Sequence, residues 1–174
     1  MWVGFLNVKE VYPPSETGGE PAMPAPEDIR GWITQHPYLV TEEAHQRVVG
    51  GVTGVQFDHI DPLLAHEARQ GCPENIPCEP LFLMHVASEG GHAVSGHEDA
   101  AMHEQGMTYA LLAGQSAQLI IVNTPSGETA TIMIQAYSHE VLEQSSQEVD
   151  RLISSVRWAD TQQNHEHNHE HNTP

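Results

Sequence analysis

The stretch that decides the fold is Gln118-Leu119-Ile120-Ile121-Val122-Asn123-Thr124-Pro125-Ser126-Gly127-Glu128-Thr129-Ala130-Thr131-Ile132-Met133-Ile134-Gln135. Apolar runs at residues 118–122 and 129–135 flank a polar segment, in which Pro125 and Gly127 favour a turn. Apolar and β-branched runs bounded by turn residues are typical of strands. The stretch therefore predicts two antiparallel strands joined as a hairpin.

The segment after this hairpin predicts one helix over residues 138–156. Ser138 is a residue type that caps helices, and Glu140 places a negative charge in the first turn, where the helix dipole stabilises it. The apolar positions form one stripe that Ser145 interrupts: Val141, Leu142, Val149, Leu152, Ile153 and Val156. A helix with one apolar stripe packs that stripe on a neighbouring layer. We expect it to lie across the sheet, with Arg157-Trp158 closing the fold.

A second helix and a second hairpin are predicted near the start of the chain. Within residues 27–36, Ile29, Trp32 and Ile33 recur at helical spacing, and Pro37 ends the helix. The pair Gly50-Gly51 permits the positive φ angles of a two-residue hairpin turn.

The order of the predicted elements defines the fold class. Further strands are predicted over Trp2–Val8, Gln46–Val49, Val52–Ile60, Pro80–Val86 and Thr108–Leu112. Strands and helices in this order predict a single α+β domain over residues 1–158, with helices packed on an antiparallel sheet. Residues 159–174 contain too few apolar side chains to pack, and we predict a disordered, histidine-rich tail.

Charge limits the partners of this chain. Six basic residues, of which only Lys9 is a lysine, oppose 24 acidic ones, so the formal net charge is −18. This field repels phosphate backbones and anionic lipid, which excludes nucleic acid and membrane surfaces as expected partners. No apolar run approaches the roughly 20 residues of a membrane span, so we expect no membrane insertion by this segment. No signal peptide opens the sequence, and we expect any export signal or anchor to lie in a segment not present here.

The two cysteines, Cys72 and Cys78, lie in a short loop that also contains Pro73 and Pro77. A disulfide that closes this loop is the favoured interpretation, and it indicates an oxidising compartment. A pair of zinc thiolates is the alternative, although the chain has no second cysteine pair and the spacing is atypical of zinc sites.

A family resemblance extends over residues 5 to 158. It depends on Phe5–Val8, Val11-Tyr12, Pro24–Asp28, Trp32, His36–Leu39, Val49–Asp58, the cysteine loop with Pro80–Phe82, Gly127–Thr129 and Ile153–Trp158. Together these stretches resemble an exported domain family of unassigned function in bacterial cell-envelope proteins and lipoproteins, which is distantly similar to the PsbP-like α/β/α sandwich. The resemblance implies export and the fold, and it supplies no catalytic residues. The chain departs from the family pattern by lacking a first strand and by adding its histidine-rich segments.

Histidines are the main candidates for chemistry. The chain has no G-x-S-x-G elbow, no H-E-x-x-H motif and no glycine-rich phosphate loop, so we do not expect an enzyme. Two groups of histidines can offer imidazole nitrogens to zinc, nickel or copper: His165, His167, His169 and His171 in the tail, and His92, His97 and His103 in a long polar loop. A polar surface loop and a polar or appended terminus are the competing interpretations of these groups.

Two function classes follow from these observations. The first is a non-catalytic extracytoplasmic interaction module with no cofactor, for which a cell-envelope protein is the candidate partner. The second is a metal-binding accessory protein that uses the histidine-rich loop and tail to bind a divalent transition metal. We expect an extracytoplasmic location, secreted or anchored at the cell envelope, for both.

Overall fold

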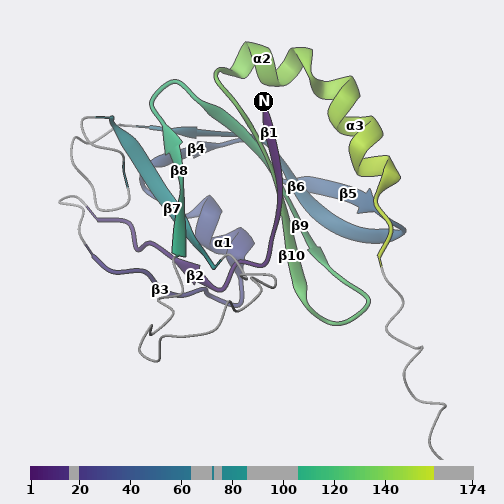
Figure 1. Ribbon diagram of the computed structural model, residues 1–174, viewed down its shortest axis with the longest axis horizontal. Helices are drawn as coiled ribbons and strands as arrows, with labels where there is room; N and C mark the ends of the chain where they lie inside the picture. Colours follow the sequence, from purple (N-terminus) through teal and green to yellow (C-terminus); the bar gives the residue numbers. More distant parts are fainter. Residues whose placement is uncertain (16–19, 64–71, 73–75, 86–105, 159–174) are drawn as a thin grey trace, which may run out of the picture.

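The computed structural model describes residues 1–15, 20–63, 72, 76–85 and 106–158 (Figure 1). It has the predicted fold class, α+β with antiparallel sheets and helices packed on them. The predicted tail and the predicted histidine-rich loop lie outside the described residues.

The larger of the sheets, here called the large sheet, has the strand order β1-β10-β9-β6-β4, with β5 also paired to β6. All of its pairs are antiparallel. Its strands are β1 (Trp2–Leu6), β4 (Leu39–Thr41), β5 (His45–Val49), β6 (Val52–Pro62), β9 (Ser116–Asn123) and β10 (Thr129–Ala136). The structure confirms both predicted hairpins, β9–β10 and β5–β6.

The remaining described strands form a second, small sheet that the sequence did not separate from the first. Its order is β3-β2-β7-β8, from β2 (Glu10–Val11), β3 (Met23–Pro24), β7 (Cys78–His85) and β8 (Gly106–Leu112). Each strand prediction was local, and an apolar strand face does not specify the sheet that will cover it. The small sheet packs its apolar face toward the large sheet, and Phe82, Leu111, Phe57 and Leu119 share one core cluster there.

Helices complete the layers on both faces of the large sheet. The helices α2 (His139–Gln144) and α3 (Ser146–Ser155) cross one face, here called the helix face (Figure 1). Leu142, Val149 and Ile153 are buried there against Ile120 and Ile134. The short α1 (Ile29–Thr34) lies on the opposite face, within the core shared with the small sheet.

The C-terminal helix differs from its prediction in two respects. The structure has two helices, because Ser145 ends α2 and also begins α3. The capping serine at position 138 is confirmed, since its Oγ accepts a hydrogen bond from the Val141 amide. The predicted apolar stripe is wrong at Leu152, which is 39% exposed. The buried positions of α3 are Val149 and Ile153, one helical turn apart, and Leu152 falls to the side of that row.

The end of the described domain is attached to the β5–β6 turn. The Trp158 Nε1 group donates a 2.8 Å hydrogen bond to the Val49 carbonyl oxygen. Gly50 has a φ of 57°, and a Cβ there would lie 2.8 Å from Trp158 Nε1. The turn therefore needs glycine for its backbone conformation and for the approach of the tryptophan.

Two buried tyrosines of the small-sheet core differ in how their hydroxyl groups are satisfied. The Tyr12 hydroxyl makes a 2.8 Å hydrogen bond with Thr108 Oγ1. Tyr109 stacks between Trp2 and Phe82, and among the described residues its buried hydroxyl has no hydrogen-bond partner. Burial raises the pKa of Tyr109 well above its ordinary value of 10.0.

This difference predicts opposite effects of removing one oxygen atom. Tyr12→Phe should lower the free energy of unfolding by about 1 kcal/mol, because it removes a made hydrogen bond. Tyr109→Phe should raise it by up to about 1 kcal/mol, because the unpaired hydroxyl costs desolvation. Above pH 10 the unfolded state ionises Tyr109 while the folded state does not, so stability falls, and Tyr109→Phe should make that fall shallower. Urea denaturation at pH 7 and pH 10.5 measures both effects; equal losses for the two variants would contradict the assignment.

Candidate metal centre

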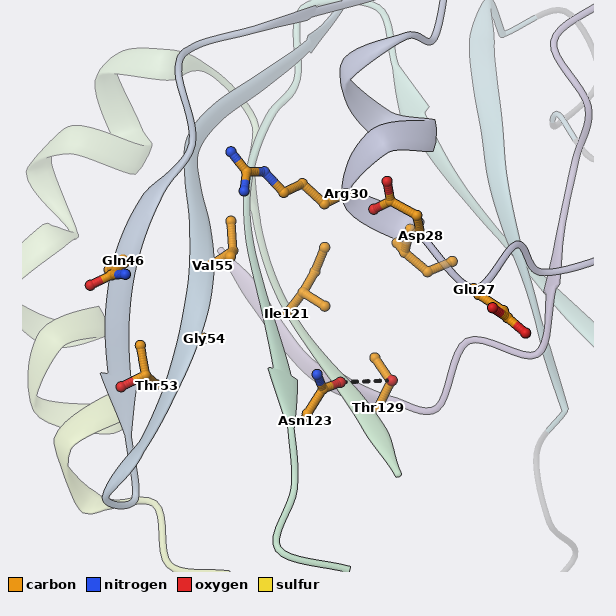
Figure 2. A pocket seen from close by; sticks show the side chains of 11 residues that line it. Glu27, Asp28, Arg30, Gln46, Thr53, Gly54, Val55, Ile121, Asn123 and Thr129 are labelled. Carbon is orange, nitrogen blue, oxygen red and sulfur yellow. Dashed lines mark hydrogen bonds between the residues drawn. The ribbon is translucent and has the colours of Figure 1, made fainter. Parts of the chain in front are cut away.

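One pocket of the large sheet opens on the face that also carries α1 (Figure 2). It has a volume of about 280 Å³, and two of its polar side chains have described hydrogen bonds that serve the local structure. Asp28 Oδ1 accepts a 2.8 Å hydrogen bond from the Gly31 amide and so caps α1. Thr129 Oγ1 donates to Asn123 Oδ1 at 3.1 Å.

The pairing of β6 with β9 is irregular, and this irregularity changes which side chains reach the helix face. Phe57 is opposite Leu119, but Ile60 is opposite Ala117, so two residues of β6 are opposite Gln118 alone. This two-against-one count is that of a β-bulge, which changes the direction of the side chains on the bulged strand. As a result, Phe57 and Ile60 are both buried in the same core cluster.

The bulge brings Asp58 and His59 to the same side of the sheet. In a regular strand, consecutive side chains point to opposite faces. Here both residues line a cavity of about 460 Å³ together with Leu142 of α2 and Val149 of α3. The cavity therefore lies between the helix face of the large sheet and its covering helices.

A hydrogen-bond network fixes Asp58 within this cavity. Asp58 Oδ1 accepts hydrogen bonds from Gln56 Nε2 at 2.5 Å and from Gln118 Nε2 at 3.3 Å. Asp58 Oδ2 lies 3.2 Å from His45 Nδ1. Three side chains thus contact the carboxylate of Asp58. The other polar residue of the bulge, His59, faces α2.

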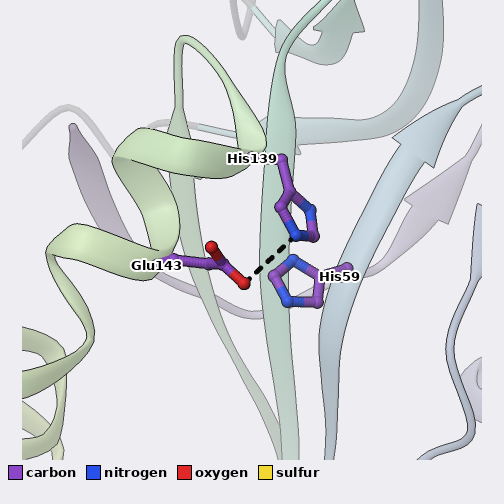
Figure 3. Close-up of side chains that lie close together, drawn as sticks. All are labelled: His59, His139 and Glu143. Atoms are coloured by element: carbon purple, nitrogen blue, oxygen red, sulfur yellow. Dashed lines mark ion pairs between the residues drawn. The ribbon is translucent and has the colours of Figure 1, made fainter.

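His59 meets two side chains of α2 and forms the only cluster of metal-ligating residues among those described (Figure 3). One nitrogen or carboxylate oxygen from each of His59, His139 and Glu143 lies within 4.8 Å of the others. The rings of His59 and His139 stack with centroids 3.8 Å apart. His139 Nε2 is 3.4 Å from Glu143 Oε1, as expected for residues one helical turn apart.

The cluster has the chemistry of a transition-metal site. Imidazole nitrogen and carboxylate oxygen suit zinc, nickel and copper, and bonds of about 2.0–2.2 Å bring ligand atoms to within roughly 3–4 Å of one another. The stacked rings do not yet aim their nitrogens at one point, but His139 and Glu143 have side chains that are 47% and 63% exposed, so the His139 ring can turn out of the stack and Glu143 can follow it. His59 Nδ1 is buried and has no hydrogen-bond partner among the described residues. Three protein ligands leave at least one coordination position for water or another ligand.

The metal ligands predicted from sequence are different residues. His92, His97, His103, His165, His167, His169 and His171 all lie outside the described residues. The signal that was missed is the spacing of His139 and Glu143, four positions apart on a predicted helix. Nothing in the sequence pairs His59 with them, because 80 residues and a strand irregularity separate it from His139.

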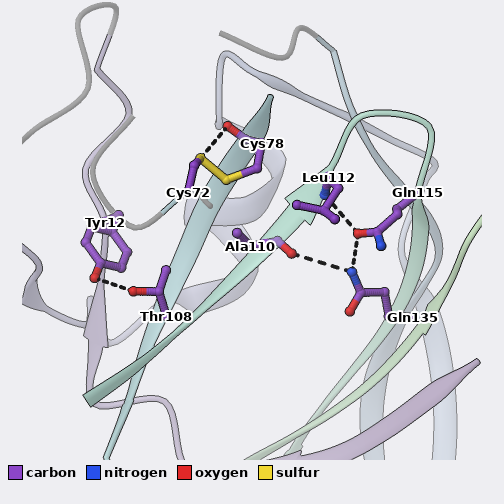
Figure 4. Close-up of a disulfide and its surroundings, with 8 residues drawn as sticks. All are labelled: Tyr12, Cys72, Cys78, Thr108, Ala110, Leu112, Gln115 and Gln135. Atoms are coloured by element: carbon purple, nitrogen blue, oxygen red, sulfur yellow. Dashed lines mark hydrogen bonds between the residues drawn. A yellow bond between two sulfur atoms is a disulfide. The ribbon is translucent and has the colours of Figure 1, made fainter. Parts of the chain in front are cut away.

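The cysteines are not part of a metal site in this structure. Cys72 and Cys78 are joined by a disulfide, as predicted, and Cys78 is fully buried at the start of β7 (Figure 4). A disulfide sulfur is not a thiolate ligand, so the alternative of a zinc thiolate pair is wrong for this form of the protein.

Comparisons with protein-family models, curated proteins and solved structures gave no match. The resemblance to exported envelope domains therefore stays a prediction. In the described part of the chain, no helix is long and apolar enough to span a membrane.

Replacement by leucine should destabilise the protein less at His59 than at His36. His59 Nδ1 is buried with no described hydrogen-bond partner, whereas the buried His36 lies 3.6 Å from the buried Glu79. In metal-free protein, His59→Leu should change the free energy of unfolding by less than about 1 kcal/mol, because within the described residues the buried Nδ1 atom makes no hydrogen bond that would be lost. His36→Leu should cost more than His59→Leu, because it removes the buried imidazole that lies 3.6 Å from the buried Glu79 carboxylate. Urea denaturation in a chelating buffer measures both, and a large loss for His59→Leu would show a structural role for that imidazole.

Proposed function

We propose that this protein is a non-catalytic, extracytoplasmic module that binds a divalent transition-metal ion through His59, His139 and Glu143. The observation that carries the proposal is the convergence of these three ligand atoms within 4.8 Å, from a bulged strand and a helix. Metal binding is the second of the two function classes that the sequence left open, and the proposed ligands differ from those predicted.

The position of His59 supports binding over a chance contact of surface groups. Its Nδ1 atom is buried, and a bound ion would satisfy it in the same way as a hydrogen bond. His139 and Glu143 come from one face of α2, so the helix holds them at a fixed separation. An ion at this point would link α2 to β6 and would stabilise the folded state by its binding free energy.

Charge and sulfur chemistry support the rest of the proposal. A formal net charge of −18 attracts cations and raises their concentration near the surface. The Cys72–Cys78 disulfide favours an oxidising compartment outside the cytoplasm. The resemblance to envelope domains points to the same compartment. An interaction role with an envelope protein is compatible with this function, but no described cluster supports it as directly.

Zinc titration by calorimetry tests the proposal. The background is the full chain with His165, His167, His169 and His171 replaced by alanine, which removes the chelating tail. In this background zinc should bind with a stoichiometry of one, and His59→Leu, His139→Ala and Glu143→Gln should each weaken binding by about tenfold or more. His45→Ala is the matched control, because His45 lines the same cavity outside the three-residue cluster; this variant should lose far less zinc affinity than the three cluster variants.

Two outcomes would contradict the proposal. One is unchanged affinity in His59→Leu and His139→Ala. The other is loss of binding only when His92, His97 and His103 are replaced, which would assign the ion to the loop instead.

A further inference from the structure

Another cavity lies between the β1 edge of the large sheet and the paired strands β7 and β8. Its volume is about 360 Å³, and its walls include Trp2, Gly4, Lys9, Met84 and Met107. None of these residues lines the cavity of the His59 cluster. Large apolar side chains remain exposed at its mouth, since Trp2 is 42% and Met107 is 54% exposed.

Two thioethers meet in this cavity. Met84 and Met107 are directly opposite each other in the antiparallel β7–β8 pair. Directly opposed residues point to the same face and have Cβ atoms about 4.5–5.5 Å apart. Because methionine is long and flexible, both sulfur atoms can reach one ion placed between them.

An aromatic ring lies beside the thioether pair. A Cβ atom on Gly4 would collide with the Trp2 ring, so that ring folds over the bare backbone of Gly4. The same ring stacks on Tyr109 with centroids 5.6 Å apart. Tyr109 is two residues from Met107 on β8 and therefore points to the same side of the strand. Trp2 is thereby held against the wall that carries the methionines.

We propose that Met84, Met107 and Trp2 form a second metal site, specific for Cu(I). Thioether sulfur is a soft ligand that selects Cu(I) over harder divalent ions. The face of an indole ring attracts a cation at short range. All three groups are uncharged, so they suit a monovalent ion better than a divalent one. The site is independent of the His59 cluster and does not require the function proposed above.

The effect of Lys9 on Cu(I) affinity can distinguish a metal site from a groove that docks an apolar segment. Lys9 lines the same cavity, and its ammonium group carries the same sign of charge as the ion. Removing that charge should therefore strengthen Cu(I) binding. A groove for an apolar segment would not respond to Lys9 in this way.

Anaerobic competition with a chromogenic Cu(I) chelator tests the site, using Cu(I) supplied as its acetonitrile complex and the same tail-histidine background. The Met84→Leu/Met107→Leu double variant should bind Cu(I) about tenfold or more weakly, while leucine keeps the volume and the fold. Lys9→Gln should bind Cu(I) more tightly. Met23→Leu is the matched control, an exposed methionine outside the cavity, and its affinity should not change.

His59→Leu distinguishes this site from the divalent one, because it should leave Cu(I) affinity unchanged. The proposal is overturned if the double methionine variant binds Cu(I) as tightly as the parent. It is equally overturned if Met23→Leu weakens binding to the same extent, since that result would indicate nonspecific thioether contact.

Discussion

The structure depends on one extra residue in β6, between Phe57 and Ile60. The pairing of β6 with β9 is the central contact of the large sheet, and without the extra residue His59 would point into the core shared with the small sheet. The bulge keeps Phe57 and Ile60 in that core and turns His59 toward α2. Bulges commonly redirect a side chain at functional sites, and here the redirected group is the one metal-ligating side chain that the sheet contributes to the cluster.

Much of the fold could be predicted from local sequence. The hairpin turns at Gly50-Gly51 and at residues 123–128, the cap at Ser138 and the disulfide depend on neighbouring residues and were correct. The division of the strands into sheets could not be predicted, because an apolar strand face does not name its partner. The helix break was also missed. Ser145 was identified as an interruption of the apolar stripe, but whether a polar residue breaks a helix or only faces solvent depends on the surface beneath it.

The sequence offered metal binding as one of two alternatives, but it did not point to the residues of the candidate site. The many histidines and acidic residues indicated transition-metal ligands. The predicted ligands lie in histidine-rich segments, because there the histidines are close together along the chain. The described cluster instead joins His59 to His139 and Glu143 through the fold. Its features are a bulge, a buried unpaired nitrogen and a helix laid across a sheet, and none of these has a sequence signature. The thioether pair also could not be predicted from sequence, because Met84 and Met107 are neighbours only through strand register.

The most direct test observes the imidazole nitrogens themselves. In two-bond ¹H–¹⁵N correlation spectra of the chain with its tail histidines replaced, one equivalent of zinc should move the ring-nitrogen signals of His59 and His139 to the range of coordinated imidazole. His45 and His36 should retain their metal-free shifts. Unchanged signals from His59 and His139, with zinc bound elsewhere, would contradict the account.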